Sequence, residues 1–69
     1  MSEKLISRYR QGLHAVYMEA PRLAVGHSLV LEGVEAEMAE RMMRSQEAIL
    51  GAQYEITQTD AGARVTRTA

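Results

Sequence analysis

The chain has 69 residues and no cysteine, and these two facts together limit how it can be stabilised. A chain of this length is expected to form a single domain, residues 1–69, and it buries a smaller fraction of its surface than a larger protein does. Without disulfides, a metal ion or a second chain is the usual source of additional stability. The sequence therefore favours a small domain that gains stability from binding another chain.

The pattern of apolar residues predicts a mainly α fold, in which an antiparallel helical hairpin is followed by a short β-hairpin. The helices are expected at residues 2–20 and 27–50, the turn between them at 21–26, and the β-hairpin at 53–68. Apolar residues recur at intervals of three and four in both long segments, which is the spacing of one helix face. Because so small a hairpin has little core, the fold is expected to be dimeric.

Local signals suggest where these elements end. Pro21 ends the first helix by disfavouring helical geometry at the preceding residue. Gly12 is a weak point in that helix, so extended backbone over residues 13–18 is an alternative. Proline is also favoured in the first turn of a helix, so the second helix can begin at Pro21 or at Ser28. Gly51 is a natural C-cap for it.

The character of the sequence changes after Ala52. Residues 54–59 alternate between two faces, and residues 63–68 are rich in β-branched side chains, which is typical of strands. Asp60-Ala61-Gly62 suits a three-residue loop with a left-handed glycine. An isolated two-stranded ribbon is marginal in water, so this hairpin must dock on the helices, pair with a partner strand or fray. A disordered polar tail is the alternative.

The expected second helix is apolar on two sides. Its main stripe, expected to face the first helix, contains Leu31, Val34, Met38, Met42 and Ile49. A second strip is expected to form the dimer interface; in it Leu29, Ala36, Met43 and Leu50 recur every seven residues, and Gly33 lies between the first two. Ordinary surface exposure of these residues is the alternative. One helix can cover only one side, so the other side is left for another chain or for solvent.

The sequence contains no recognisable catalytic or metal-binding motif. His14 and His27 are not at the spacing of a helical metal site. The glutamates of the second helix are expected on an exposed face beside arginines, which does not provide the desolvated pocket that general acid–base catalysis needs. The five glycines are scattered singly, so no phosphate-binding loop is present. We expect no enzymatic activity, no cofactor and no metal.

The charge balance argues against nucleic acid as the main partner. Eight Lys and Arg residues oppose nine Asp and Glu residues, giving a net charge of −1, whereas phosphate binding needs an excess of basic residues. A small DNA-binding regulator or antitoxin-like protein remains the alternative, with phosphate contacts from Arg8, Arg10, Arg64 and Arg67. No apolar stretch is long enough to span a membrane, and the charged N-terminus does not resemble a signal peptide. A cytoplasmic location is therefore expected.

A few side chains outside the expected core are candidates for contact with another protein. Arg10, His14 and Met18 fall off the buried arc of the first helix, and Met43 lies on the second strip. Glu37 and Glu40 lie on the acidic face of the second helix and can steer a basic partner. A structural adaptor of a virion or secretion apparatus is a further possible role for such a binding surface.

The length, the Arg-rich and Lys-poor composition and the expected layout of two helices and a short tail resemble the small early-expressed host-takeover proteins of Pseudomonas phages. That family includes an anti-quorum-sensing protein, which inhibits a LuxR-type transcriptional regulator and a type IV pilus assembly ATPase. The resemblance implies a protein–protein interaction module that occludes host proteins in the bacterial cytoplasm. The acidic face around Glu37 and Glu40 would suit the basic DNA-binding domain of such a regulator.

Overall fold

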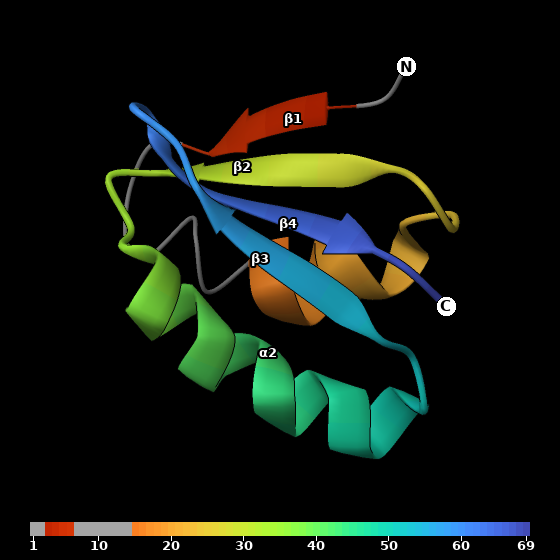
Figure 1. The fold of residues 1–69 in the computed structure, drawn as a ribbon. Coiled ribbons are helices and arrows are strands. Elements are labelled where there is room, and N and C mark those ends of the chain that lie inside the picture. Colours follow the sequence, from red (N-terminus) through yellow and green to blue (C-terminus); the bar gives the residue numbers. More distant parts are fainter. Residues whose placement is uncertain (1–2, 7–14) are drawn as a thin grey trace.

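The computed structural model describes residues 3–6 and 15–69. In chain order, the elements are strand β1 (Glu3–Ile6), a π-helical segment η1 (Ala15–Glu19), a 3₁₀ turn η2 (Ala20–Arg22), strand β2 (Ser28–Glu32), helix α2 (Ala36–Leu50), strand β3 (Tyr54–Gln58) and strand β4 (Gly62–Arg67). Figure 1 shows the strands side by side in one sheet, with α2 running beneath it. The fold is therefore α+β.

The sheet has four strands in the order β1-β2-β4-β3. β1 is parallel to β2, and β4 is antiparallel to both β2 and β3. Consequently β2 and β3 run in the same direction with β4 between them, and α2 connects them as a split β-α-β unit. Val65 in β4 lies opposite Leu29 on one side and Ile56 on the other. β4 is thus a central strand, whereas β3 forms one edge of the sheet.

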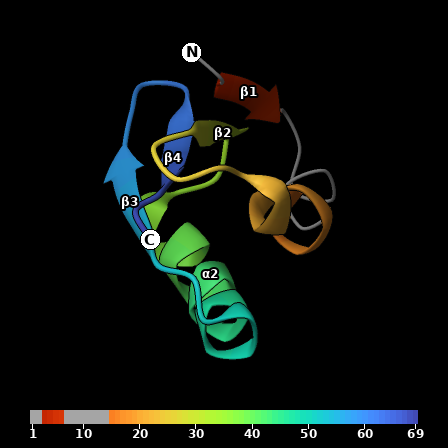
Figure 2. The same cartoon turned by 90° about the vertical axis from the view of Figure 1, so that its right-hand side faces the viewer.

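One face of the sheet carries the core. Alternation along the strands directs Leu29, Leu31 and Val65 to the same face. α2 and η1 both lie on this side, and in Figure 2 no helix of the described residues lies on the opposite side. The buried cluster consists of Val16, Ala20, Leu29, Leu31, Val34, Ala39, Met42, Met43, Ala63 and Val65.

The predicted mainly α helical hairpin is wrong, and the largest error is in the segment 27–50. Its first part, Ser28–Glu32, is the strand β2, and only Ala36–Leu50 is helical. Leu29, Val30 and Leu31 are all buried although they alternate between the two faces of the sheet. A short continuous apolar run of this kind cannot be distinguished from a helix turn by its spacing alone. Gly33, with φ of +78°, separates the strand from the helix.

The predicted helix at 2–20 is also wrong. Glu3–Ile6 is a strand paired with β2, and the helical residues near the end of the segment belong to the short η1 and η2. Pro21 lies in the first turn of η2, a position where its missing N–H costs no hydrogen bond. The extended alternative over residues 13–18 is not found where it overlaps η1. Gly12 and the rest of 7–14 lie outside the described residues.

The C-terminal half agrees better with the sequence prediction. α2 ends at Gly51, whose left-handed φ of +70° makes it the expected C-cap. β3 and β4 form the expected β-hairpin. Its loop is shorter than predicted, because Thr59 and Gly62 exchange backbone hydrogen bonds of 2.7 and 3.3 Å. Glycine is nevertheless required at Gly62, where φ is +150° and a Cβ atom would overlap the Leu31 carbonyl oxygen.

Because Ser28–Glu32 is a strand and not part of the helix, the buried side of α2 also differs from the prediction. Met38 and Ile49, predicted in the core stripe, are 41% and 75% exposed. Leu31, Val34 and Met42 of the same stripe are buried. The buried side of α2 is formed by Ala39, Met42, Met43 and Gln46. The helix therefore packs on the sheet through these four residues, and only Met42 among them belongs to the predicted core stripe.

Candidate functional site

The outer side of β3 has backbone groups without partners. Thr59 and Gly62 exchange both of their backbone hydrogen bonds and so form a hydrogen-bonded pair. Such pairs alternate along antiparallel strands, so the backbone N–H and C=O groups of successive β3 residues point in turn toward β4 and away from it. Tyr54, Ile56 and Gln58 are the residues whose N–H and C=O groups point away. Among residues 3–6 and 15–69, no donor or acceptor meets the N–H or C=O of Ile56. This edge can therefore accept another strand.

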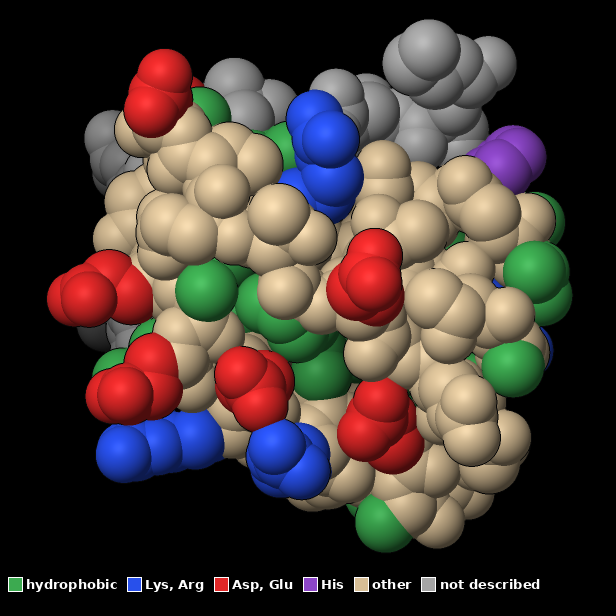
Figure 3. Space-filling model, in the orientation of Figure 1, with side chains coloured by type: hydrophobic (Ala, Val, Ile, Leu, Met, Phe, Trp, Pro, Cys, Tyr) green, Lys and Arg blue, Asp and Glu red, His purple; other side chains and the backbone are tan. Residues whose placement is uncertain are grey.

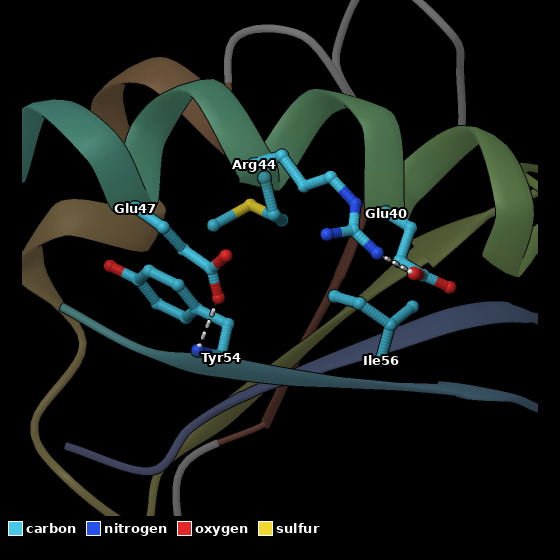
Figure 4. A pocket seen from close by; sticks show the side chains of 6 residues that line it. Glu40, Arg44, Glu47, Tyr54 and Ile56 are labelled. Carbon is cyan, nitrogen blue, oxygen red and sulfur yellow. Dashed lines mark hydrogen bonds and ion pairs between the residues drawn. The ribbon is translucent and has the colours of Figure 1, made fainter.

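A groove lies between this edge and α2. It has a volume of about 380 Å³ and is lined by Glu40, Met43, Arg44, Glu47, Tyr54 and Ile56. Figure 4 shows the three charged side chains coming from α2, and Tyr54 and Ile56 rising from β3. Figure 3 shows the same region as a hollow with apolar side chains at its floor and charged side chains around it. The groove thus combines an apolar floor with a charged rim.

The hollow continues past the end of the helix. A second depression of about 450 Å³ shares Arg44 and Glu47 with the groove. It extends over the α2–β3 connection at Gly51, Ala52 and Gln53. The two depressions are joined at Arg44 and Glu47 of α2, so the hollow is longer than the groove itself and suits an extended ligand better than a compact one.

Three hydrogen bonds from side chains fix β3 against the helical layer. The Tyr54 N–H donates to Glu47 Oε2 at 2.9 Å, and the Tyr54 hydroxyl donates to the Ala20 carbonyl oxygen at 3.1 Å. At the other end of β3, the Ala36 N–H donates to Gln58 Oε1 at 2.8 Å and so caps the N-terminus of α2. Both ends of the groove are therefore held, so its width is set before any ligand binds.

Of the three charged side chains around the groove, Glu40 and Arg44 form an ion pair with each other and Glu47 is outside it. Arg44 Nη2 lies 2.7 Å from Glu40 Oε1, and in Figure 4 its guanidinium turns toward Glu40 and away from Glu47. Glu47 accepts the Tyr54 N–H, and no basic side chain of the described residues forms an ion pair with it. Burial raises the pKa of the Tyr54 hydroxyl above its ordinary value, Arg67 opposes this shift and Glu47 adds to it. Within the described part of the chain, Glu47 is thus the carboxylate of the groove that has no ion-pair partner.

The predicted partner-binding residues do not form one surface. Met18 is 51% exposed on η1, and Glu37 and Glu40 are exposed on α2, where they pair with Arg41 and Arg44 at i, i+4 spacing. Met43 is buried in the core at the floor of the groove. Arg10 and His14 lie outside the described residues. Of this set, the structure brings only Glu40 and Met43 together at the groove.

The strip predicted as a dimer interface does not exist as a helix face, because its first two residues precede the helix. Leu29 lies on β2 and is buried in the chain's own core, and Gly33 lies in the connection before α2. Ala36 is the first residue of α2, Met43 is buried, and Leu50 at the end of α2 is 44% exposed. The seven-residue spacing therefore joins residues with different environments.

The arginines of the DNA-binding alternative are also separated. Arg64 and Arg67 are three residues apart on β4 and therefore point to opposite faces of the sheet. Arg67 donates to the Leu23 and Ala69 carbonyl oxygens at 2.8 and 3.0 Å. Arg8 and Arg10 lie outside the described residues. Arg64 and Arg67 therefore do not make a common basic surface.

Metal binding and membrane spanning by a helix have no structural basis in residues 3–6 and 15–69. Within them, no cluster of three His, Cys, Asp or Glu side chains could hold a metal ion. No helix in the same part of the chain is long and apolar enough to cross a membrane.

The sequence reasoning missed Glu47, Tyr54 and Ile56 as site residues. The predicted hairpin is the signal that could have found them. A third strand that pairs with one strand of a hairpin leaves the other strand at the edge of the sheet, with unpaired backbone groups. No protein-family model, curated protein sequence or solved structure matches this chain.

Proposed function

We propose that this protein is a protein–protein interaction module that binds an extended segment of its partner by strand addition to β3. The observation that carries this proposal is the unpaired backbone of Ile56 beside a groove with an apolar floor. Strand addition uses backbone hydrogen bonds for affinity and pockets for alternate side chains for specificity. Both parts are present along β3.

The state of this edge supports a binding role over a purely structural one. Proteins usually protect edge strands with lysines, prolines, bulges or a covering segment. β3 has the sequence YEITQ, with no lysine and no proline, and no described segment covers its outer side. An added strand would place every second side chain in the groove, because side chains alternate along a strand.

The resemblance to phage host-takeover proteins supplies candidate partners. A LuxR-type regulator and a type IV pilus ATPase are the two targets that it implies, and occlusion of either would make the protein an inhibitor. The layout of two long helices is no longer part of this resemblance, so it rests on length and composition. The strand-addition proposal depends on neither target.

The test uses two substitutions at one position. Ile56→Pro removes the outward N–H and leaves the bonds to β4, whereas Ile56→Ala removes as much packing but keeps the N–H. Tagged wild-type and variant proteins are used to capture partners from a bacterial lysate and to bind a purified LuxR-type regulator and pilus ATPase. A partner held by wild type and Ile56→Ala but lost with Ile56→Pro is the expected result. Equal capture by all three proteins would refute strand addition.

Self-association competes for the same edge. The predicted homodimer could form by pairing β3 with the β3 of a second copy. Sedimentation equilibrium of wild type and Ile56→Pro distinguishes this case: we expect monomers for both at the concentrations where the partner binds. A wild-type dimer that Ile56→Pro dissociates would assign the edge to a second copy.

A further inference from the structure

We infer that the groove selects a long cationic side chain, Lys or Arg, at the position of the added strand that faces Ile56. This inference rests on the proposed strand addition and specifies the chemistry of the segment that is bound.

The side chain of the added residue that faces Ile56 points toward α2. Residues directly opposite each other in neighbouring strands send their side chains to the same face of the sheet. The Ile56 side chain points to the face that α2 covers and lines the groove. The residue that faces Ile56 must therefore extend its side chain into the groove, over the floor formed by Met43 and Ile56.

The Glu47 carboxylate has no ion-pair partner among the described residues. Arg44 is already paired with Glu40, whereas Glu47 accepts one hydrogen bond, from the Tyr54 N–H through Oε2. A carboxylate has about four acceptor sites on its two oxygens, so Glu47 can accept further donors. An aliphatic stem that covers the apolar floor and a cationic head that reaches Glu47 are the two properties of Lys and Arg. A neutral side chain would cover the floor but leave the carboxylate without a counterion.

The same charges disfavour a second copy as the occupant. The residues of β3 are Tyr54, Glu55, Ile56, Thr57 and Gln58, none of which is basic. Pairing β3 with itself would leave Glu47 of each copy without a cation and would add Glu55 to an edge that is already acidic. A basic segment of a different protein satisfies Glu47, and a second β3 does not.

The probes are two short blocked threonine-rich peptides, one with a central arginine and one with citrulline, its neutral isostere, at the same place. Fluorescence anisotropy measures the Kd of each with the full chain. Wild type is expected to bind the arginine peptide about tenfold more tightly, which corresponds to one charge-assisted hydrogen bond of ordinary strength. Ile56→Pro should abolish binding of both peptides, and Ile56→Ala should not.

Glu47→Gln tests the residue that makes the selection. Glutamine keeps an Oε1 acceptor for the Tyr54 N–H, so the fold is retained, and circular dichroism checks this. The preference for arginine over citrulline should fall to about twofold or less with this variant. Glu37→Gln is the matched control, since it removes the same charge from the same helix at an exposed position that does not line the groove. It should leave the preference unchanged.

The failures of the two proposals are distinguishable. Equal affinity of both peptides for wild type, with binding still lost in Ile56→Pro, would overturn the cationic selection and leave strand addition standing. An arginine preference that survives Glu47→Gln would overturn the role of Glu47 and with it the inference. If neither peptide binds to wild type, both proposals are overturned.

Discussion

The two strands of the C-terminal hairpin are neighbours with different surroundings. β4 lies between β2 and β3 and buries Ala63 and Val65, whereas β3 pairs with a neighbouring strand on one side only and leaves Ile56 half-buried. Ile56 and Val65 face each other directly, yet the Val65 N–H points into the sheet and the Ile56 N–H points out of it. One hairpin thus supplies both a central strand of the sheet and the edge that we propose for binding.

The largest expected difference comes from placing proline at each of these two positions. Val65→Pro removes a bond to β2 as well as core packing, and it should destabilise the chain by about 3 kcal/mol or more, enough to unfold much of it. Ile56→Pro removes an N–H that is unbonded in the free chain and should cost about 1 kcal/mol, mainly from packing. Urea unfolding followed by circular dichroism measures both. Equal losses would contradict the assignment of β3 as an open edge.

A smaller effect is expected where β3 is attached to the helix. Gln58→Ala removes the Oε1 acceptor for the Ala36 N–H and should lower the free energy of unfolding by about 1 kcal/mol, as loss of a helix cap does. Gln53→Ala is the control, because the Gln53 side chain is exposed and forms no hydrogen bond in the described structure. If the two variants have the same stability, Gln58 does not act as a cap in solution.

The smallest effect is a pH dependence at Tyr54. Burial raises the pKa of this hydroxyl in the folded chain, so the folded state holds its proton more tightly than the unfolded state does. The resulting stability is complete below the ordinary tyrosine pKa of about 10 and is lost as the pH rises through the folded value. Tyr54→Phe should therefore lose less stability than wild type between neutral and alkaline pH. Parallel pH profiles for the two proteins would show that Tyr54 does not contribute.

The sequence predicts the second half of this fold better than the first, for a physical reason. Near Gly51 and in the hairpin, local signals decide the structure: a glycine that can adopt positive φ, and side chains that alternate along a strand. Ser28–Glu32 has no such signal, because an apolar run suits a buried strand and a helix equally well. Its strand state depends on pairing with β1 and β4, and β1 is more than twenty residues away in sequence.

The candidate site could be predicted only in part. The sequence places Glu40 and Met43 on one helix, and both residues line the groove. Docking of the hairpin on the helices is one of the three outcomes that the sequence leaves open. What it does not contain is the strand order, which makes β3 the edge and β4 the centre. Glu47 and Ile56 become site residues only through that order, because they come from different elements.

Amide hydrogen exchange of β3, measured by NMR with and without a bound partner segment, tests the central claim most directly. In the free chain, the Glu55 and Thr57 amides should be protected by their bonds to β4, and the Ile56 amide should exchange rapidly. When the arginine peptide binds, the Ile56 amide should become protected as well, while Glu55 and Thr57 change little. Binding that leaves the Ile56 amide in rapid exchange would contradict strand addition at this edge.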